Sequence, residues 1–98
     1  MTILARNLRV GHLEIDLLAR DGPAVVLIEV RTRGAGSWGS ALGSVNPAKQ
    51  RRLRAAAGLL WSRRFARAAG VERMRFDVAA VDLDAGPSPV VEYVQGAF

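Results

Sequence analysis

Three carboxylates lie inside the most apolar segments of this 98-residue chain. Glu14 and Asp16 belong to residues 13–20, and Glu29 belongs to residues 24–32. Burying an unpaired carboxylate is expensive, so a strand that keeps one usually provides a partner or a metal for it. Oxygen ligands without histidine or cysteine favour Mg²⁺ or Mn²⁺ over zinc. These residues therefore predict a divalent-cation site.

The geometry of this site depends on a hairpin turn at residues 21–23, where Asp-Gly is followed by proline. If the hairpin closes symmetrically, Asp16 faces Glu29 and Glu14 faces Arg31, with Cβ atoms about 4.5–5.5 Å apart. Like charges at that distance repel each other, and a bridging cation would convert the repulsion into ligation. In the alternative, Glu14 and Arg31 form a structural ion pair, and Asp16 or Glu29 lies at a solvated end of the sheet.

The elements that must position these residues are five strands and one long helix. The expected strands are residues 3–10, 13–20, 24–32, 75–83 and 90–94, and the expected helix spans residues 47–69. Asn46 and Pro47 supply its N-cap and first residue, and Gly70 ends it. A long helix between the third and fourth strands is a crossover, so those two should be parallel and the earlier strands antiparallel. We expect one mixed α/β domain over residues 1–98, in the order β-β-β-α-β-β, with a glycine-rich loop at residues 34–44.

Positive charge is concentrated in and just beyond the expected helix. The chain has 14 Lys and Arg against 9 Asp and Glu, and Lys49 is the only lysine. Residues 49–75 carry a net charge of +8, which leaves −3 for the rest. A basic stripe beside a carboxylate site is typical of nucleic-acid-binding proteins, although a GC-biased genome could also produce a solvated, arginine-rich helix. We expect phosphate contacts from Arg33, Lys49, Arg51, Arg52, Arg54, Arg63 and Arg67.

Composition excludes several classes of protein. The absence of cysteine excludes disulfide scaffolds and thiolate zinc sites, and an apolar content of 50% excludes a wholly disordered chain. No apolar run reaches the roughly 18 residues of a membrane span, and the N-terminus lacks the layout of a signal peptide. We therefore expect a small cytoplasmic protein that does not bind membranes.

The spacing of the carboxylates resembles that of a known nuclease superfamily. Asp16, followed on the next strand by Glu29-Val30-Arg31 and then by a basic helix, is similar to the PD-(D/E)XK, or restriction-endonuclease-like, pattern. A closer resemblance is to the uncharacterised bacterial YraN-like proteins, relatives in fold of archaeal Holliday-junction resolvases. It covers nearly the whole chain and is carried by residues 3–7, 14–22, 28–33, 49–53, 75–78 and 97–98.

This resemblance implies a restriction-endonuclease-like mixed sheet and a metal-dependent endonuclease, a hydrolase acting on DNA and in particular on branched or structured DNA. Asp16 and Glu29 would bind Mg²⁺ or Mn²⁺, with Glu14 as an accessory carboxylate. The residue at position 31 would orient or activate the attacking water, and Gln50 would be an auxiliary site residue.

The chain departs from the family pattern at position 31, where the family usually has lysine. Arginine is effectively never deprotonated, so Arg31 cannot be a general base, although it can stabilise a pentavalent phosphate. Lys49 could reach the site from the helix, or it could be an ordinary surface lysine. Arg31 also supports an alternative function, a non-catalytic nucleic-acid-binding or assembly module that retains the nuclease fold.

A second departure concerns the N-terminus. The family usually has a helix ahead of the first strand, and this helix is missing here, because Met1 and Thr2 lead straight into Ile3. We expect exposed apolar surface, which a second copy in a homodimer could cover, or a truncated start.

Two further polar residues are less easily placed. His12 has no spaced partner for a metal site or a catalytic triad, so we expect it at the surface. Asp77, on a later strand, could approach the carboxylates, but the sequence does not decide whether it does.

Overall fold

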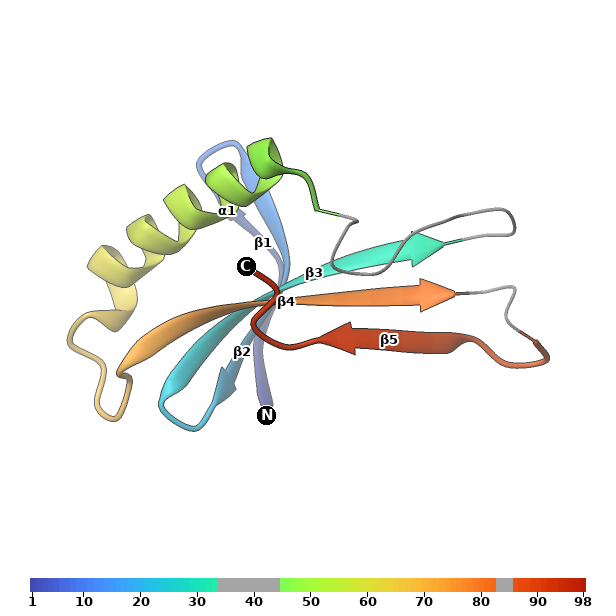
Figure 1. Ribbon diagram of the computed structural model, residues 1–98. Helices are drawn as coiled ribbons and strands as arrows, with labels where there is room; N and C mark the ends of the chain where they lie inside the picture. The colour runs from blue at the N-terminus through green and yellow to red at the C-terminus, as the bar shows by residue number, and fades with distance from the viewer. Residues whose placement is uncertain (34–44, 83–85) are drawn as a thin grey trace.

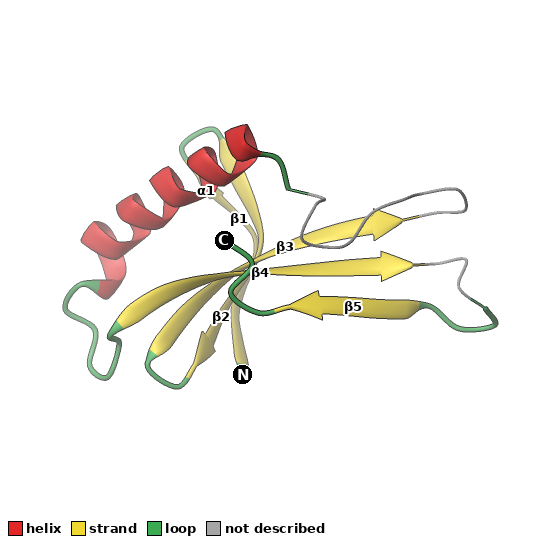
Figure 2. Cartoon of the chain, in the orientation of Figure 1, coloured by secondary structure: helices red, strands yellow, loops and turns green. Residues whose placement is uncertain are grey.

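The structure is a computed structural model that describes residues 1–33, 45–82 and 86–98. Within these ranges five strands form one mixed sheet, and a helical segment covers part of one face (Figures 1 and 2). The strands are β1 (Thr2–Val10), β2 (Leu13–Asp21), β3 (Ala24–Arg33), β4 (Arg73–Asp82) and β5 (Val90–Val94), and the helical elements are α1 (Pro47–Leu60) and η2 (Trp61–Phe65). The expected β-β-β-α-β-β order is confirmed, whereas the expected loop at residues 34–44 lies outside the described residues.

The strands lie side by side in chain order, and the register follows from the connections between them. The hairpin joining β2 to β3 closes symmetrically, with Asp21 opposite Ala24 and Leu17 opposite Ile28. The β3–β4 pair is parallel because α1 provides the crossover, and the other three pairs are antiparallel. These pairings confirm the expected strand directions and the hairpin register, and they agree with a restriction-endonuclease-like sheet.

The start of the helix is fixed locally. The Asn46 side chain accepts a hydrogen bond from the Lys49 backbone N–H at 2.8 Å, and Pro47 occupies the first turn, where its missing N–H is not needed. The N-cap therefore determines where Lys49 sits on the first turn, and the same turn faces the second half of β3.

The end of the helix differs from the sequence expectation. Regular α-helix stops at Leu60, and residues 61–65 form a π-helical turn closed by the Ala66 N–H and the Trp61 carbonyl oxygen at 2.7 Å. In an α-helix, residues five apart point about 140° away from each other, whereas i→i+5 bonding brings them to one side. The π-helical turn thus allows both Leu60 and Phe65 to be buried, and the prediction that the helix continues to residue 69 is wrong.

Both faces of the central strand β3 are apolar. Val25 and Leu27 pack toward α1, beside Ala56 and Leu60. On the opposite face Val26 belongs to a second cluster, which contains Ala19, Ala24, Val26 and Ile28. Residues on both faces of β3 are therefore buried, so a carboxylate in this part of the strand must be accommodated at a buried position.

The edges of the sheet are more exposed. Ile3 and Leu4 on β1, and Val90 and Val91 on β5, all present apolar side chains to solvent. This exposed surface was expected, and its coverage by a second copy stays a prediction. None of the helices that the structure describes combines the length and the apolar character needed to cross a lipid bilayer.

Candidate functional site

Glu29 lies in the second half of β3, on the face of the sheet that α1 covers. Its neighbour in the parallel register is Val78 of β4, which packs against Leu53 of α1. Only 5% of Glu29 is exposed, and its Oε2 atom is buried with no hydrogen-bond partner among the described residues. Buried polar atoms are nearly always hydrogen-bonded in native proteins, so an unpartnered carboxylate oxygen requires an explanation.

Two cationic side chains approach the other oxygen of Glu29. The Lys49 Nζ atom lies 3.6 Å from Glu29 Oε1, and the Arg31 Nη1 atom lies 3.8 Å from the same oxygen. Both distances exceed the roughly 2.7–2.9 Å of a tight charge-assisted hydrogen bond. Of the two alternatives that the sequence left open for Lys49, the structure shows the one in which Lys49 reaches Glu29 from the helix, and neither cation hydrogen-bonds Oε2.

Asp16 approaches from β2. The regular β2–β3 ladder ends at Leu17 and Ile28, and beyond it the Val30 N–H donates to Asp16 Oδ2 at 2.8 Å. The carboxylate of Asp16 thus takes the place of a backbone carbonyl at the point where β3 leaves β2. This position brings Asp16 close enough to Glu29 for the two charges to interact.

The electrostatic balance at Glu29 is unfavourable to its charged form. Burial raises the pKa of Glu29, and the charge of Asp16 raises it further, whereas Lys49 and Arg31 lower it by smaller amounts. The pKa therefore stays above the ordinary 4.5 despite two nearby cations. A buried, unpartnered oxygen beside a second carboxylate is the donor set that a hard divalent cation prefers. Asp16 and Glu29 therefore fit Mg²⁺ or Mn²⁺.

Glu14 is not brought into this group. It is exposed and stands opposite Arg9 in the β1–β2 ladder. The expected facing pair of Glu14 and Arg31 is wrong, because β2 and β3 separate before that pair and Arg31 lies beside Glu29 instead. Across residues 1–33, 45–82 and 86–98, no three His, Cys, Asp or Glu side chains gather closely enough to hold a metal, so the site contains two carboxylates.

Gln50 lies one residue beyond Lys49 in the first turn of α1. Its Nε2 atom donates to the Val45 carbonyl oxygen at 3.1 Å, and its side chain is half-buried. Gln50 therefore braces the segment that enters the helix, and through it the position of Lys49.

Comparison with known proteins identifies the family of this chain. Residues 1–81 match the model of a family described as Uncharacterised protein family UPF0102. The chain belongs to this family. UPF0102 is the family of the YraN-like proteins, so the resemblance found in the sequence is confirmed.

Relatives in this family span most of the chain. A UPF0102 protein of Sorangium cellulosum, sce2912, is 53% identical over 96 residues, which cover 98% of this chain and 67% of the relative. A UPF0102 protein of Acidothermus cellulolyticus is 42% identical and covers all of this chain and 80% of its own length. One from Rhodococcus opacus is 40% identical with the same coverage. The family description states no activity, so the chemistry must be argued from the site.

Most of the predicted phosphate-binding arginines are exposed on the helical segment or just past its end, namely Arg51, Arg52, Arg54, Arg63 and Arg67. Arg54 differs from the others because its guanidinium lies 5.7 Å from the ring centres of both Phe76 and Phe98, which stack on each other at 4.9 Å. The guanidinium of Arg54 is therefore partly committed to this aromatic pair. The side chain of Arg33 lies outside the described residues.

Asp77 does not approach the carboxylate pair. It lies beside Ile28 in the parallel register, on the face opposite Glu29, and is completely buried. The sequence did not predict that Arg75, Tyr93 and the Gly96 N–H donate hydrogen bonds to Asp77. Arg75 and Asp77 are two residues apart on one strand and so share a face, a signal that could have revealed this pair.

Proposed function

We propose that this UPF0102 chain is a metal-dependent endonuclease that hydrolyses DNA phosphodiester bonds, with Mg²⁺ or Mn²⁺ held by Asp16 and Glu29. The observation that carries the proposal is the buried Oε2 atom of Glu29, which has no partner in the described structure although a second carboxylate lies beside it. A purely structural carboxylate at this depth would have donors on both oxygens. DNA as the substrate also agrees with the expected cytoplasmic location.

The side chains around the two metal ligands would have different roles in phosphodiester hydrolysis. A bound divalent cation would polarise a phosphoryl oxygen and lower the pKa of bound water. Arg31 would stabilise the negative charge that develops on the phosphate, since a guanidinium is suited to contacts with phosphate oxygens. Lys49 has three donors and a loose contact to Glu29, so it can orient the attacking water or contact the phosphate.

The exposed arginines of the helical segment support a polyanionic substrate. Arg51 and Arg52 follow Lys49 directly on α1, and Arg63 and Arg67 extend the charge along and just past η2. Phosphate contacts by these side chains would release counterions, so the logarithm of the DNA affinity should fall linearly with the logarithm of the salt concentration. Branched or structured DNA is the substrate class that the family resemblance favours.

A second candidate function is a non-catalytic DNA-binding or assembly module. Arg31 favours it, because arginine replaces the usual lysine and, together with Lys49, partly neutralises Glu29 without any metal. Such a module would bind DNA with the same salt dependence but would neither bind Mn²⁺ at Asp16 nor cleave DNA.

The deciding experiment measures cleavage of labelled four-way junction, flap, single-stranded and duplex DNA with Mg²⁺ or Mn²⁺. Glu29→Gln should lower the cleavage rate more than about 100-fold, since even outer-shell partners of metal ligands contribute 10–100-fold. Glu72→Gln is the matched control, because Glu72 is an exposed acid whose contact is a 3.5 Å surface ion pair with Arg73. Equal rates for wild type and Glu29→Gln, or no cleavage of any substrate, would reject the proposal.

Mn²⁺ binding by calorimetry separates the two candidates. Asp16→Asn retains a carbonyl oxygen that can accept the Val30 N–H while removing the charge. Wild type should bind Mn²⁺ and Asp16→Asn should not. Equal heats for both proteins would favour the non-catalytic module.

A further inference from the structure

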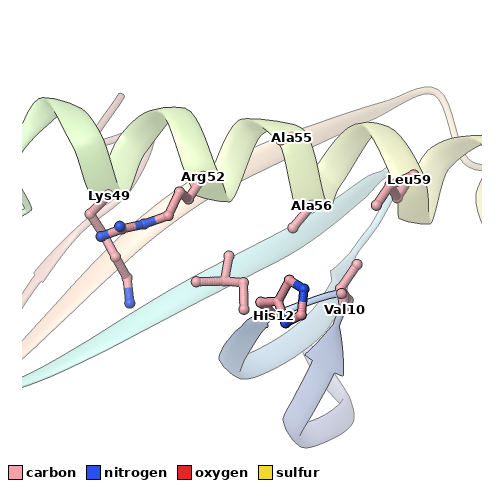
Figure 3. Close-up of a pocket in the computed structure, with 9 residues that line it drawn as sticks. Val10, His12, Lys49, Arg52, Ala55, Ala56 and Leu59 are labelled. Atoms are coloured by element: carbon pink, nitrogen blue, oxygen red, sulfur yellow. The ribbon is translucent and has the colours of Figure 1, made fainter.

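A groove of about 460 Å³ lies between the β1–β2 turn and α1, and we call it the turn groove (Figure 3). Its walls are mostly apolar and are formed by Val10, Leu13, Ala55, Ala56 and Leu59. Its volume falls in the range of 300–1,000 Å³ that is usual for small-ligand sites. The groove is large enough to accept one flat, largely apolar group.

In the part of the chain that the structure describes, the polar side chains at the turn groove are all nitrogen bases or cations. His12 comes from the β1–β2 turn, and Lys49 and Arg52 come from the facing side of α1, whereas no Asp or Glu within residues 1–33, 45–82 and 86–98 lines the groove. In Figure 3 the His12 ring lies across from Ala56, and the Lys49 side chain extends from the helix toward the strands. A ligand that suits this groove therefore combines an apolar, stackable part with negative charge.

The turn groove is continuous with the carboxylate site through one residue. Lys49 lines the groove and also places its Nζ atom 3.6 Å from Glu29 Oε1. A group bound in the groove would thus lie next to a phosphate contacted by Lys49. Bases stack on histidine rings and arginine planes in many nucleic-acid complexes, so His12 and Arg52 supply suitable surfaces.

We infer that the turn groove binds one unpaired nucleotide of the DNA substrate, with its base against the apolar wall and His12, and its phosphate near Lys49 and Arg52. A base inside a duplex is stacked and paired and cannot enter, so the groove selects substrates with a single-stranded segment. The inference rests on the proposed function, because it takes the nucleic-acid substrate of that site and specifies its local structure.

The test compares two short, fluorescein-labelled single strands of equal length and charge, one of thymidylate and one built of abasic units. Anisotropy is measured in EDTA, so no cleavage can occur. Wild type should bind the thymidylate strand about tenfold more tightly than the abasic strand, since stacking one base contributes about 1–3 kcal/mol. Equal affinities for the two strands would overturn the inference.

Variants then locate the preference. Ala55→Leu fills the groove from an exposed helical position that tolerates leucine, so it should abolish the base preference and leave the affinity for the abasic strand unchanged. Ala66→Leu is the matched control, because Ala66 is also exposed but does not line the groove, and it should keep the tenfold preference. His12→Ala should reduce the preference by several-fold. An unaltered preference in Ala55→Leu, or a change in oligomeric state in its place, would show that the groove does not hold a base.

The same measurements distinguish failure of this inference from failure of the proposed function. Glu29→Gln should keep the base preference while it loses cleavage, because Glu29 does not line the groove. A wild type that cleaves DNA but binds both strands equally refutes the inference alone. A wild type that prefers bases but cleaves nothing refutes the proposed function and supports the groove as a nucleotide site.

Discussion

Glu29 and Asp77 are both buried carboxylates of adjacent parallel strands, one register position apart, yet their surroundings are opposite. Asp77 accepts two hydrogen bonds from Arg75, at 2.9 and 3.1 Å, one from the Gly96 N–H at 2.9 Å, and one from the Tyr93 hydroxyl. Glu29 has two cations at a longer distance from one oxygen and, among the described residues, no hydrogen-bond partner at the other. The same chemical group is therefore fully satisfied on one face of the sheet and left incomplete on the other.

The pKa values of Asp77 and Glu29 are shifted in opposite directions. Burial alone would raise the pKa of Asp77, but the hydrogen bonds it accepts outweigh burial and hold the pKa below its ordinary 3.8. Burial also raises the pKa of Glu29, and Asp16 adds to it, so that the pKa stays above 4.5. A satisfied carboxylate stabilises the fold, whereas an incomplete one reduces stability and is available to a ligand. The comparison thus assigns Asp77 to the scaffold and supports the proposed role of Glu29 as a ligand.

The largest expected effect is on the scaffold side. Asp77→Asn should lower the free energy of unfolding by about 3 kcal/mol, because it removes the charge from a fully buried, hydrogen-bonded carboxylate, although Arg75 keeps its ion pair with Asp21 at 3.0 Å. Urea denaturation measures the change. As the pKa of Asp77 is lowered on folding, its contribution is present above pH 3.8 and is lost as the pH falls through the lower, folded-state pKa. A loss below about 1 kcal/mol would contradict the structural role.

The next effect concerns metal binding. A Mn²⁺ concentration about 100-fold above Kd should raise the free energy of unfolding of wild type by about 2.7 kcal/mol, since the ion binds only the folded site. Asp16→Asn should lose this gain. Tyr93→Phe, on the opposite face, should retain it, although the variant itself is less stable. Thermal denaturation with and without Mn²⁺ checks all three proteins, and a metal response that survives Asp16→Asn would remove the contrast between the faces.

A smaller effect of opposite sign is expected for Glu29→Gln in metal-free buffer. It should raise the free energy of unfolding at neutral pH by about 1 kcal/mol, because an incompletely compensated buried charge is removed. Since the pKa of Glu29 is raised on folding, the wild type is not penalised below pH 4.5 and loses stability as the pH rises toward the folded-state pKa. The gain of Glu29→Gln should therefore vanish in acid. Destabilisation at neutral pH would make Glu29 a second structural carboxylate.

The smallest effect is expected for Glu14→Gln. Glu14 is exposed and opposite Arg9, so its replacement should change the free energy of unfolding by less than about 0.5 kcal/mol. Mn²⁺ affinity should not change either. Calorimetry with the purified variant is sufficient, and a clear loss of Mn²⁺ binding would restore Glu14 as an accessory ligand.

Local chemistry made much of the site predictable. The Asp-Gly-Pro turn fixes the hairpin register, and alternation along each strand then sends Asp16 and Glu29 to one face. The Asn46 cap fixes the start of α1 and so the position of Lys49 in its first turn, whereas the 3.6 Å approach of Lys49 to Glu29 also requires α1 to pack on the sheet. The turn and the cap are each determined by contacts that span only a few residues.

What the sequence did not predict depends on contacts between distant segments. The helix ends early because a π-helical turn brings Phe65 to the core, and the Glu14–Arg31 pair does not form because the Asp16 side chain replaces a ladder partner. The turn groove exists only because the β1–β2 turn packs beneath α1, so the neighbours of His12 could not be found from spacing.

The hydrogen bond from the Val30 N–H to Asp16 fixes this carboxylate before any ligand arrives. Binding therefore does not have to restrict that side chain, a restriction that costs about 0.5–1.5 kcal/mol for a mobile group. Fraying of the β2–β3 hairpin at its open end would break this hydrogen bond, and it should therefore lower the affinity for a ligand of Asp16. Ligand binding should therefore be detectable at the Val30 amide, whose hydrogen exchange with deuterated solvent should slow when the site is occupied.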